Sequence, residues 1–503
     1  MSTALRRLAP VDGVRSIAHI SLVCLHTAML LTGKLPAEGP LWQSFKSSIP
    51  FTVFQAGGIQ VDIMFMLSGF LLVFNLLNKN SLDMPSVLDH TFRRWLRMAP
   101  MMLVSVILGH YVIQDCWGMP YTYWDGGKAI FPTRVMSYLL CYTNYCDQIT
   151  YGSYLGSLMW SCAVDLQAGV LTLILVKFIA SFYQIQQKST LIRRLRVVFF
   201  ILLVVACVIR GSFFNKDKVN MVLLGEFFHF RLLQPRSSYT WMEVFFGHEW
   251  KTTNSAVDVT HEYLNKMYFP THTRYGPFMV GGVVACSLLL AMEKYKPKAA
   301  SRGSANKGSM WSSVMGWIFT TVAVVQLAVP CLPAPPIEDV PLEAQVFVTA
   351  ALRNLSACSA GFLMYRTLVP VDHPWHWASL NSFFSLRVWK AIAAISFVSY
   401  LIHFRLLMEI IYSVPMQRFF GLSMPSTELT AGAGAGADAD AIGSAADALA
   451  TEWLVVMVKV FLIGMAVSFS FAQFIHEFVE KPTATAIQKY VLPARQQSAK
   501  KVN

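Results

Sequence analysis

The chain has 503 residues, of which 55% are hydrophobic and only 14% are charged. A soluble protein of this length carries about 25% charged residues, so the composition excludes an ordinary water-soluble fold. Lysine and arginine exceed aspartate and glutamate by 41 to 28, but the basic residues are spread over short segments between apolar runs. This distribution indicates a membrane topology signal and argues against a nucleic-acid partner.

Apolar runs of about 20 residues, the length that crosses a lipid bilayer, recur along the whole sequence. We expect about ten membrane-spanning helices, at 14–33, 57–77, 98–114, 157–181, 196–213, 275–292, 311–331, 344–366, 387–412 and 453–476. The first run contains Arg15 and His19 and lacks a small-residue cleavage site, so we expect it to be retained as a helix. The predicted fold class is therefore an all-α polytopic, multi-pass membrane protein. The endoplasmic reticulum, the plasma membrane and other organelles all remain open as its location.

The basic segments fall on one side of the membrane if ten spans are counted. Clusters precede the first and third spans, separate the fourth from the fifth and the sixth from the seventh, and follow the last: Arg6 and Arg7; Arg93, Arg94 and Arg97; Lys188, Arg193, Arg194 and Arg196; Lys294, Lys296, Lys298, Arg302 and Lys307; Lys481, Lys489, Arg495, Lys500 and Lys501. The opposite segments 332–343 and 413–452 are acidic. By the positive-inside rule both termini are cytosolic, and 484–503 forms a cytosolic tail.

Two outside segments have contrasting compositions. Residues 214–274 are rich in aromatic residues, which predicts a lid or an amphipathic helix against the membrane surface. Residues 431–450 are low-complexity Ala, Gly and Asp, which predicts a flexible loop. Three of the nine cysteines, Cys116, Cys141 and Cys146, fall in one outside loop where a disulfide is permitted. No zinc-type cysteine spacing occurs, so we expect no metal cofactor.

The first span carries four ionisable residues on one helical face: Asp12, Arg15, His19 and His26. Charged groups within membrane spans are costly and mark functional sites. At a rise of 1.5 Å per residue, Arg15 and His26 are separated by roughly 16 Å. Arg15 is therefore expected at the cytosolic mouth of the helix and His26 deeper in the membrane.

Ionisable residues of other spans fall at these same two depths. Asp62, Asp165 and Arg353 enter from the outer face and approach the level of His26, whereas Arg94 and Arg97 share the cytosolic level of Arg15. The pattern predicts basic groups at the cytosolic entrance and a His/Asp/Arg constellation above them. Structural roles are the alternative, because an intramembrane histidine commonly joins helices and an arginine cluster commonly anchors a span.

Seven short motifs lie in order along the chain. They read VDGVRSIAHISLVCLH (11–26), VDIMFMLSGFLLVFNL (61–76), RRWLRMAP (93–100), MWSCAVDLQAG (159–169), YFPTHTRYGPFMVGG (268–282), ISFVSYLIHF (395–404) and FVEKP (478–482). This ordered set resembles the acyltransferase-3 family of membrane proteins, in particular the eukaryotic branch with the nose-resistant-to-fluoxetine proteins; bacterial O-antigen acetylases are related. The resemblance implies one acyltransferase transmembrane domain over 1–483.

The resemblance also implies an activity: transfer of an acyl group, most simply acetyl, from cytosolic acyl-CoA to a hydroxyl of a glycan or lipid (O-acetylation). Arg15, Arg94 and Arg97 are expected to pair with the phosphates of CoA. His26 is expected to act as general base, with Asp62 or Asp165 orienting its imidazole. Arg353 either neutralises Asp165 or polarises the thioester carbonyl.

Four further residues of the motifs are expected near the acceptor: Trp160, Gln167, Arg274 and His403. Two other functions remain open from the sequence. A proton-coupled transporter of a small solute also uses intramembrane His, Asp and Arg, although no repeat of two matching halves is visible. A catalytically inactive receptor or scaffold of the same fold is the second alternative.

Overall fold

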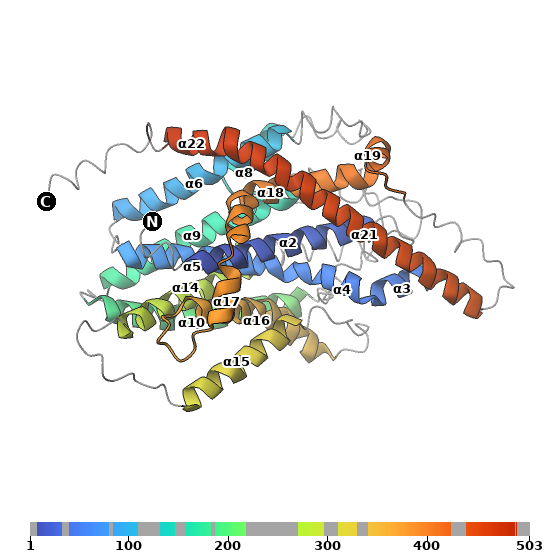
Figure 1. The fold of residues 1–503 in the computed structure, drawn as a ribbon. Coiled ribbons are helices and arrows are strands. Elements are labelled where there is room, and N and C mark those ends of the chain that lie inside the picture. Colours follow the sequence, from blue (N-terminus) through green and yellow to red (C-terminus); the bar gives the residue numbers. More distant parts are fainter. Residues whose placement is uncertain are drawn as a thin grey trace.

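The computed structural model describes residues 8–32, 40–79, 84–108, 131–145, 156–182, 187–217, 270–295, 310–328, 341–423, 439–487 and 489. Over these ranges the chain is helical and contains no β-strand. The long helices form a bundle (Figure 1). They are α2 (Ala9–Thr32), α5 (Gln60–Lys79), α6 (Met84–Ile107), α9 (Gly156–Phe182), α10 (Lys188–Asp217), α14 (Thr271–Lys294), α15 (Met310–Ala328), α16 (Leu342–Leu368), α18 (Arg387–Tyr412) and α21 (Ala439–Ile475).

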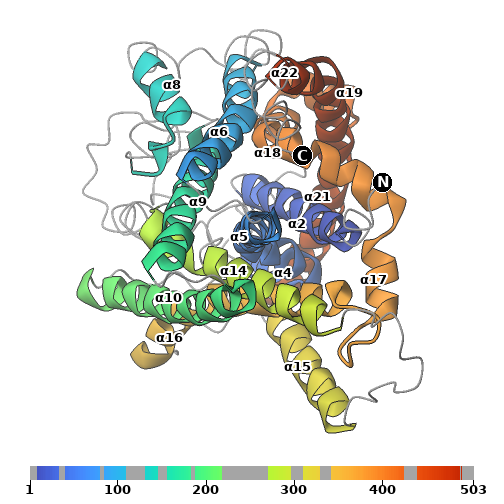
Figure 2. The ribbon, with the colours of Figure 1, turned by 90° about the vertical axis from the view of Figure 1, so that its left-hand side faces the viewer.

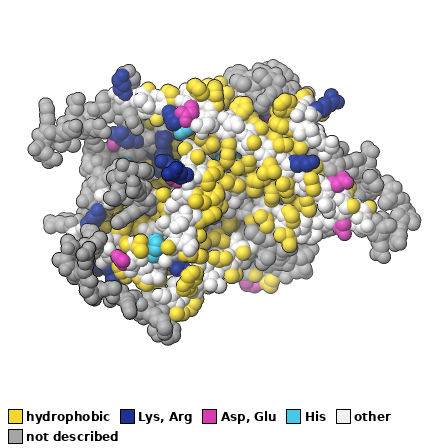
Figure 3. Space-filling view, viewed as in Figure 1, with side chains coloured by type: hydrophobic (Ala, Val, Ile, Leu, Met, Phe, Trp, Pro, Cys, Tyr) yellow, Lys and Arg dark blue, Asp and Glu magenta, His cyan; other side chains and the backbone are white. Residues whose placement is uncertain are grey.

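Each of the ten predicted spans overlaps one of these long helices. Among the residues that the structure describes, six stretches are long and apolar enough to cross a membrane by length and composition: Ala9–Leu31, Ile49–Asn78, Leu158–Phe182, Thr271–Lys294, Arg387–Tyr412 and Gly443–Ala486. Hydrophobic side chains cover the middle of one face of the molecule, whereas Lys and Arg side chains gather toward the end where α22 (Lys481–Ala486) lies (Figure 3). The prediction of an all-α membrane protein is thus confirmed.

Several helices extend beyond the apolar run that predicted them. The third span was expected to begin at residue 98, but α6 begins at Met84, so that Arg93, Arg94 and Arg97 lie within the helix rather than before it. Likewise α10 begins at Lys188 instead of residue 196. Hydropathy detects only the part of a helix that is apolar, whereas straight-chain polar residues continue a helix with little loss of free energy.

The low-complexity segment is also partly helical. We predicted a flexible loop over 431–450, and this is wrong for 439–450, which forms the start of α21. Alanine is the best helix former, and Ala446 and Ala450 are buried. The helix start packs on α3 (Pro40–Ser47), where the Ser44 hydroxyl donates to Asp447 Oδ1 at 2.6 Å. Tertiary contact therefore orders a segment whose composition is typical of a linker.

Other predicted segments fall largely outside the described residues. Of the outside loop 214–274, residues 218–269 lie outside the description, and its two ends belong to α10 and α14. Cys116 and Cys146 of the disulfide prediction also lie outside, while Cys141 has a free thiol. The predicted tail 484–503 begins inside α22, and most of it is not described.

Helix α2 lies in the interior of the bundle, as the view along the bundle in Figure 2 shows. It packs against α5, α18 and α21, and its C-terminal half meets α4 (Ile49–Gln55) and the 3-10 turn η1 (Ala56–Ile59). Helices α5 and α14 approach each other to backbone contact, because glycine stands at the crossing in both: Gly69 meets the carbonyl of Phe278, and Gly281 meets the carbonyl of Met66. This close crossing fixes the helices that carry the site around α2.

Candidate active site

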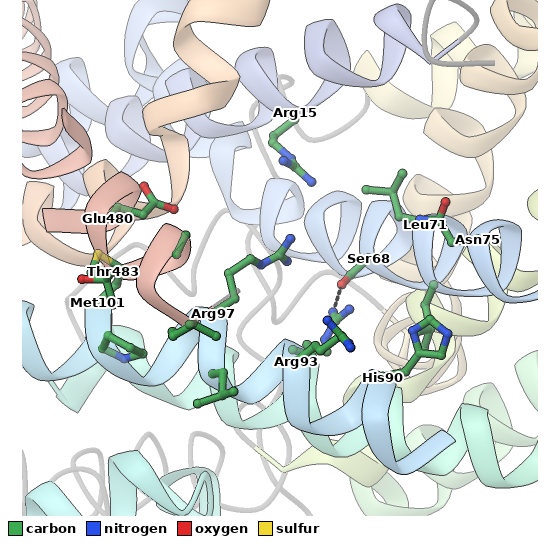
Figure 4. A pocket seen from close by; sticks show the side chains of 16 residues that line it. Arg15, Ser68, Leu71, Asn75, His90, Arg93, Arg97, Met101, Glu480 and Thr483 are labelled. Atoms are coloured by element: carbon green, nitrogen blue, oxygen red, sulfur yellow. Dashed lines mark hydrogen bonds between the residues drawn. The ribbon is translucent and has the colours of Figure 1, made fainter. Parts of the chain in front are cut away.

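A cavity of about 500 Å³ opens at the start of α2, between α5, α6 and the end of the last helix (Figure 4). We call it the arginine cavity, because four arginines line it: Arg15, Arg93, Arg94 and Arg97. Its other polar lining residues are Ser68, Asn75, His90, Glu480 and Thr483. The arginines that the sequence predicted at one level are therefore brought together, although they come from helices α2 and α6.

Two of these arginines are already neutralised and two are not. Arg94 binds the Asp165 carboxylate through Nη2, at 2.6 Å from Oδ1 and 2.5 Å from Oδ2, and also contacts the Ser68 hydroxyl. Arg93 pairs with Asp89 one turn away, at 2.7 Å.

Arg15 and Arg97 make no hydrogen bond or ion pair with any residue that the structure describes. The carboxylate of Glu480 lines the same cavity and pairs with His476 Nδ1 at 2.6 Å. The cavity therefore offers two unpaired guanidinium groups to an anion, the arrangement with which proteins bind phosphate.

A smaller cavity of about 200 Å³ adjoins the arginine cavity and reaches into the bundle. The two share Arg15, Ser68, Arg94, Arg97 and Glu480. The deeper part, which we call the apolar extension, is lined by Leu22, Val61, Phe65 and Phe397, with Tyr400 among its polar residues. Leu22 stands one helical turn before His26 on α2, so the extension runs along the face of α2 that joins Arg15 to His26.

His26 is hydrogen-bonded to a second histidine. His26 Nδ1 lies 2.7 Å from Nε2 of His403 on α18, and the two rings stack with centroids 4.9 Å apart. His403 is fully buried, whereas His26 keeps 8% of its surface exposed. His403, which was predicted to lie near the acceptor, is the direct hydrogen-bond partner of His26.

The backbone of α18 determines which nitrogen of His26 is free. His403 Nδ1 lies 2.8 Å from the carbonyl oxygen of Tyr400 and 3.1 Å from that of Ser399. A carbonyl only accepts, so His403 Nδ1 carries the proton and His403 Nε2, in the neutral ring, is an acceptor. His26 must then donate from Nδ1, which leaves its Nε2 with a lone pair and, within the described residues, no hydrogen-bond partner.

His19 is packed beside this pair. Its Nε2 lies 2.9 Å from the Ser399 hydroxyl, and its ring lies edge-on to His403 and stacked on Phe469. The ring is fully buried. His19 thus joins α2 to α18 through the hydroxyl of Ser399, the residue whose carbonyl also contacts His403.

Asp62 does not orient His26, and this part of the sequence prediction is wrong. Its two carboxylate oxygens accept from Arg274 Nη1 at 2.8 Å and Arg353 Nη1 at 2.7 Å, and the carboxylate is completely buried. Arg353 also donates to the carbonyl of Gly58 at 3.2 Å. These three residues form a buried ion cluster that ties α5 to α14 and α16.

Asp165 does not orient His26 either, because Arg94 occupies its carboxylate. The related prediction that Arg353 neutralises Asp165 is wrong for the same reason. Predicted depth alone could not separate these pairings, since the sequence predicts similar levels for Asp62 and Asp165. The side chain that orients His26 is a histidine 377 residues away in the chain.

Arg274 and Gln167, two of the other residues predicted near the acceptor, are held by partners other than His26. Arg274 is held by Asp62 and lies over the ring of Trp160, 5.3 Å from its centroid. Gln167 donates to the Cys141 carbonyl at 2.7 Å and to Asn144 Oδ1 at 2.9 Å. In this structure Gln167 therefore anchors the turn at 141–145 to α9.

Cys141 in this turn is not activated as a nucleophile. Burial, together with the negative charge of Asp165, raises the pKa of the Cys141 thiol to about 11. A thiol with so high a pKa is protonated at neutral pH and reacts slowly.

Three residues of the site were given no role in it from the sequence: Ser68, Ser399 and Glu480. Each stands in a quoted motif, Ser68 in VDIMFMLSGFLL, Ser399 in ISFVSYLIHF and Glu480 in FVEKP. Glu480 reaches the cavity from a single π-helical turn, His476–Glu480, at the end of α21. Such turns occur often at functional sites, but nothing in the sequence marks one.

No family model, no curated protein and no solved structure matches this chain. Across the described ranges, no group of three or more His, Cys, Asp or Glu side chains is placed to hold a metal ion. The geometry of the site is thus the basis for the function proposed below.

Proposed function

We propose that this chain is an integral membrane O-acyltransferase. It takes an acyl group, most simply acetyl, from acyl-CoA on the cytosolic side and transfers it to a hydroxyl of a glycan or lipid. We further propose ten membrane spans with both termini in the cytosol. The observation that carries the proposal is the continuity of the arginine cavity, with its unpaired Arg15 and Arg97, and an apolar extension that ends one turn from His26.

The shape and charge of the two cavities match the two halves of acyl-CoA. Its phosphate groups are multiply charged and pair with Arg15 and Arg97 at the wide mouth. Its pantetheine arm is narrow and uncharged, and it follows the apolar extension past Leu22 and Phe65. The roughly 16 Å between Arg15 and His26 along α2 then sets how far the thioester reaches.

His26 acts as the general base in this proposal. Its Nε2 lone pair takes the proton of the acceptor hydroxyl while the oxygen attacks the thioester carbonyl carbon. The carbon–sulfur bond breaks, the acyl ester forms, and the imidazolium of His26 returns its proton to the departing CoA thiolate. His403 keeps Nδ1 of His26 as the donor throughout, as the carboxylate does in a hydrolase triad, although a neutral imidazole stabilises the positive charge less.

Acetyl-CoA binding and release of CoA thiol test the proposal. Purified protein in liposomes of total membrane lipid and glycolipid receives radiolabelled acetyl-CoA. His26→Ala should bind acetyl-CoA normally and lose turnover by about 100-fold or more. Arg15→Ala should weaken binding by roughly 10-fold to 100-fold, the equivalent of one charge-assisted contact.

A matched control is His376→Ala, since His376 lies in the connection between α16 and α18, outside both cavities. Wild-type protein that neither binds acetyl-CoA nor releases thiol would overturn the proposal, and flux of a labelled solute in its place would favour a transporter. Turnover unchanged in His26→Ala would overturn the assignment of the base alone.

A further inference from the structure

A second hollow lies on the far side of the bundle from α21, between α10, α14 and α16. It has a volume of about 490 Å³, and we call it the basic groove. One end carries Arg196, Lys294 and His373 together with Tyr295 and Tyr365. The rest is lined mainly by apolar residues, among them Phe200, Leu203, Val280, Val284 and Phe362. The groove shares no lining residue with the arginine cavity or its extension.

The described residues that line the polar end of the groove include two cations and no carboxylate. Arg196 and Lys294 are both exposed, and neither makes an ion pair within the described part of the chain. Glu293 and Asp372 are adjacent in sequence to groove residues, but neither lines the groove. Two cations without an acidic neighbour in the lining are complementary to an anion.

His373 adds a neutral donor to this end. Its Nδ1 accepts from the backbone N–H of Trp375 at 3.1 Å, so the proton of the neutral ring is on Nε2. Burial, with the charges of Lys294 and His376 nearby, lowers the pKa of His373 to about 4. The ring is thus neutral near pH 7 and presents an N–H beside the hydroxyl of Tyr365, 3.5 Å away.

The apolar end opens on a surface of the bundle that exposes apolar side chains. Phe200 is 58% exposed, and its neighbours Val197 and Ile201 on α10 are exposed to a similar degree. Along α14 the distance from Val280 to Lys294 is about 21 Å. The hydrocarbon core of a bilayer is about 30 Å thick, so the groove is long enough for an acyl chain that lies within one leaflet.

From this juxtaposition we propose that the basic groove binds an anionic phospholipid, with its phosphate between Arg196 and Lys294 and one acyl chain against Val280 and Val284. A water-soluble phosphate compound would leave the apolar walls uncovered, and a zwitterionic lipid would not complement two cations. Basic pockets between membrane helices on the cytoplasmic side are known to take such headgroups. The site is independent of the proposed acyl transfer.

Lipid binding by the purified full chain tests this site. Protein in mild detergent is titrated with radiolabelled phosphatidylglycerol and, separately, with phosphatidylcholine. Phosphatidylglycerol should bind, and the double variant Arg196→Gln, Lys294→Gln should weaken its binding at least 10-fold. Arg193→Gln, on the same helix but outside the groove, is the matched control and should bind normally.

Further arms separate the possible ligands. Val284→Phe fills the apolar wall without a change of charge and should also weaken phosphatidylglycerol binding, with acetyl-CoA binding retained. Glycerol 3-phosphate should not compete. The proposal would be overturned by equal binding of the two lipids or by full competition from glycerol 3-phosphate. It would also be overturned if Arg15→Ala lost phosphatidylglycerol binding and the groove variants did not.

Discussion

The Nδ1 atom of His26 lies 2.7 Å from Nε2 of His403, and the direction of this hydrogen bond is set by two backbone carbonyls of α18. In its neutral form His403 cannot donate from Nε2 without losing its bonds to those carbonyls. The proposed base is consequently Nε2 of His26, whatever acceptor the protein uses. The arrangement makes His403 a positioning residue rather than one that touches the substrate.

This role predicts a separation of kinetic effects at His403. His403→Ala should lower kcat by about 10-fold to 100-fold, because a misplaced base loses much of its effect, while the KM for acetyl-CoA stays near the wild-type value. His403→Gln should recover part of the rate, since its amide oxygen can accept from His26 Nδ1. Thiol release measured over a range of acetyl-CoA concentrations checks both variants. A rise in KM with unchanged kcat would instead place His403 in substrate binding.

The Asp62 cluster should matter mainly for stability. Asp62→Asn leaves the guanidinium groups of Arg274 and Arg353 buried without a counter-charge, which typically costs about 3–5 kcal/mol. The thermal unfolding midpoint of the purified variant in detergent should fall clearly. Asp89→Asn is the control, because its pair with Arg93 is partly exposed and such pairs contribute about 0.3–0.5 kcal/mol. An unaltered midpoint with lost turnover would return Asp62 to the reaction itself.

Substitution of glycine by alanine should have opposite effects at two positions, one at the crossing of α5 and α14 and one near the start of α21. A β-carbon at Gly281 would overlap the Met66 carbonyl and the Phe70 backbone nitrogen, so Gly281→Ala should push the helices apart and destabilise the protein. Gly443, near the start of α21, has no atom within 4 Å of such a β-carbon. Gly443→Ala should be neutral or stabilise by up to about 1 kcal/mol, because alanine is the better helix former. Similar midpoints for the two variants would contradict the close crossing.

Neighbouring arginines of α6 should differ in their effect on acyl-CoA binding. Arg97 makes no ion pair within the described residues, whereas Arg93, one turn earlier, is paired with Asp89. Arg97→Ala should weaken acetyl-CoA binding by roughly 10-fold, and Arg93→Ala should weaken it less. Affinity should also fall as ionic strength rises, since these charges are partly open to solvent. Equal losses would mean that the cavity acts through its total charge and not through unpaired groups.

Much of the fold could be predicted from the sequence because the hydropathy of a helix depends only on the residues of that segment. Ten apolar runs marked ten long helices, and the sequence placed Arg15, Arg94 and Arg97 at one level of the membrane. Helix ends were less predictable. Hydropathy could not show that α6 begins at Met84 or that Ala-rich residues from 439 onward join α21, because these parts are held by contacts with other helices or by helix propensity.

The sequence by itself therefore determined the class of protein, the order of its helices and the relative positions of the ionisable residues along each helix, since each depends on local composition and spacing. Only the tertiary structure decided which of these residues meet. Asp62 pairs with Arg274 and Arg353, Asp165 with Arg94, and His26 with His403. Residues at one depth on ten helices have many possible partners, and the rotation and packing of each helix, fixed by contacts far apart in the chain, select among them.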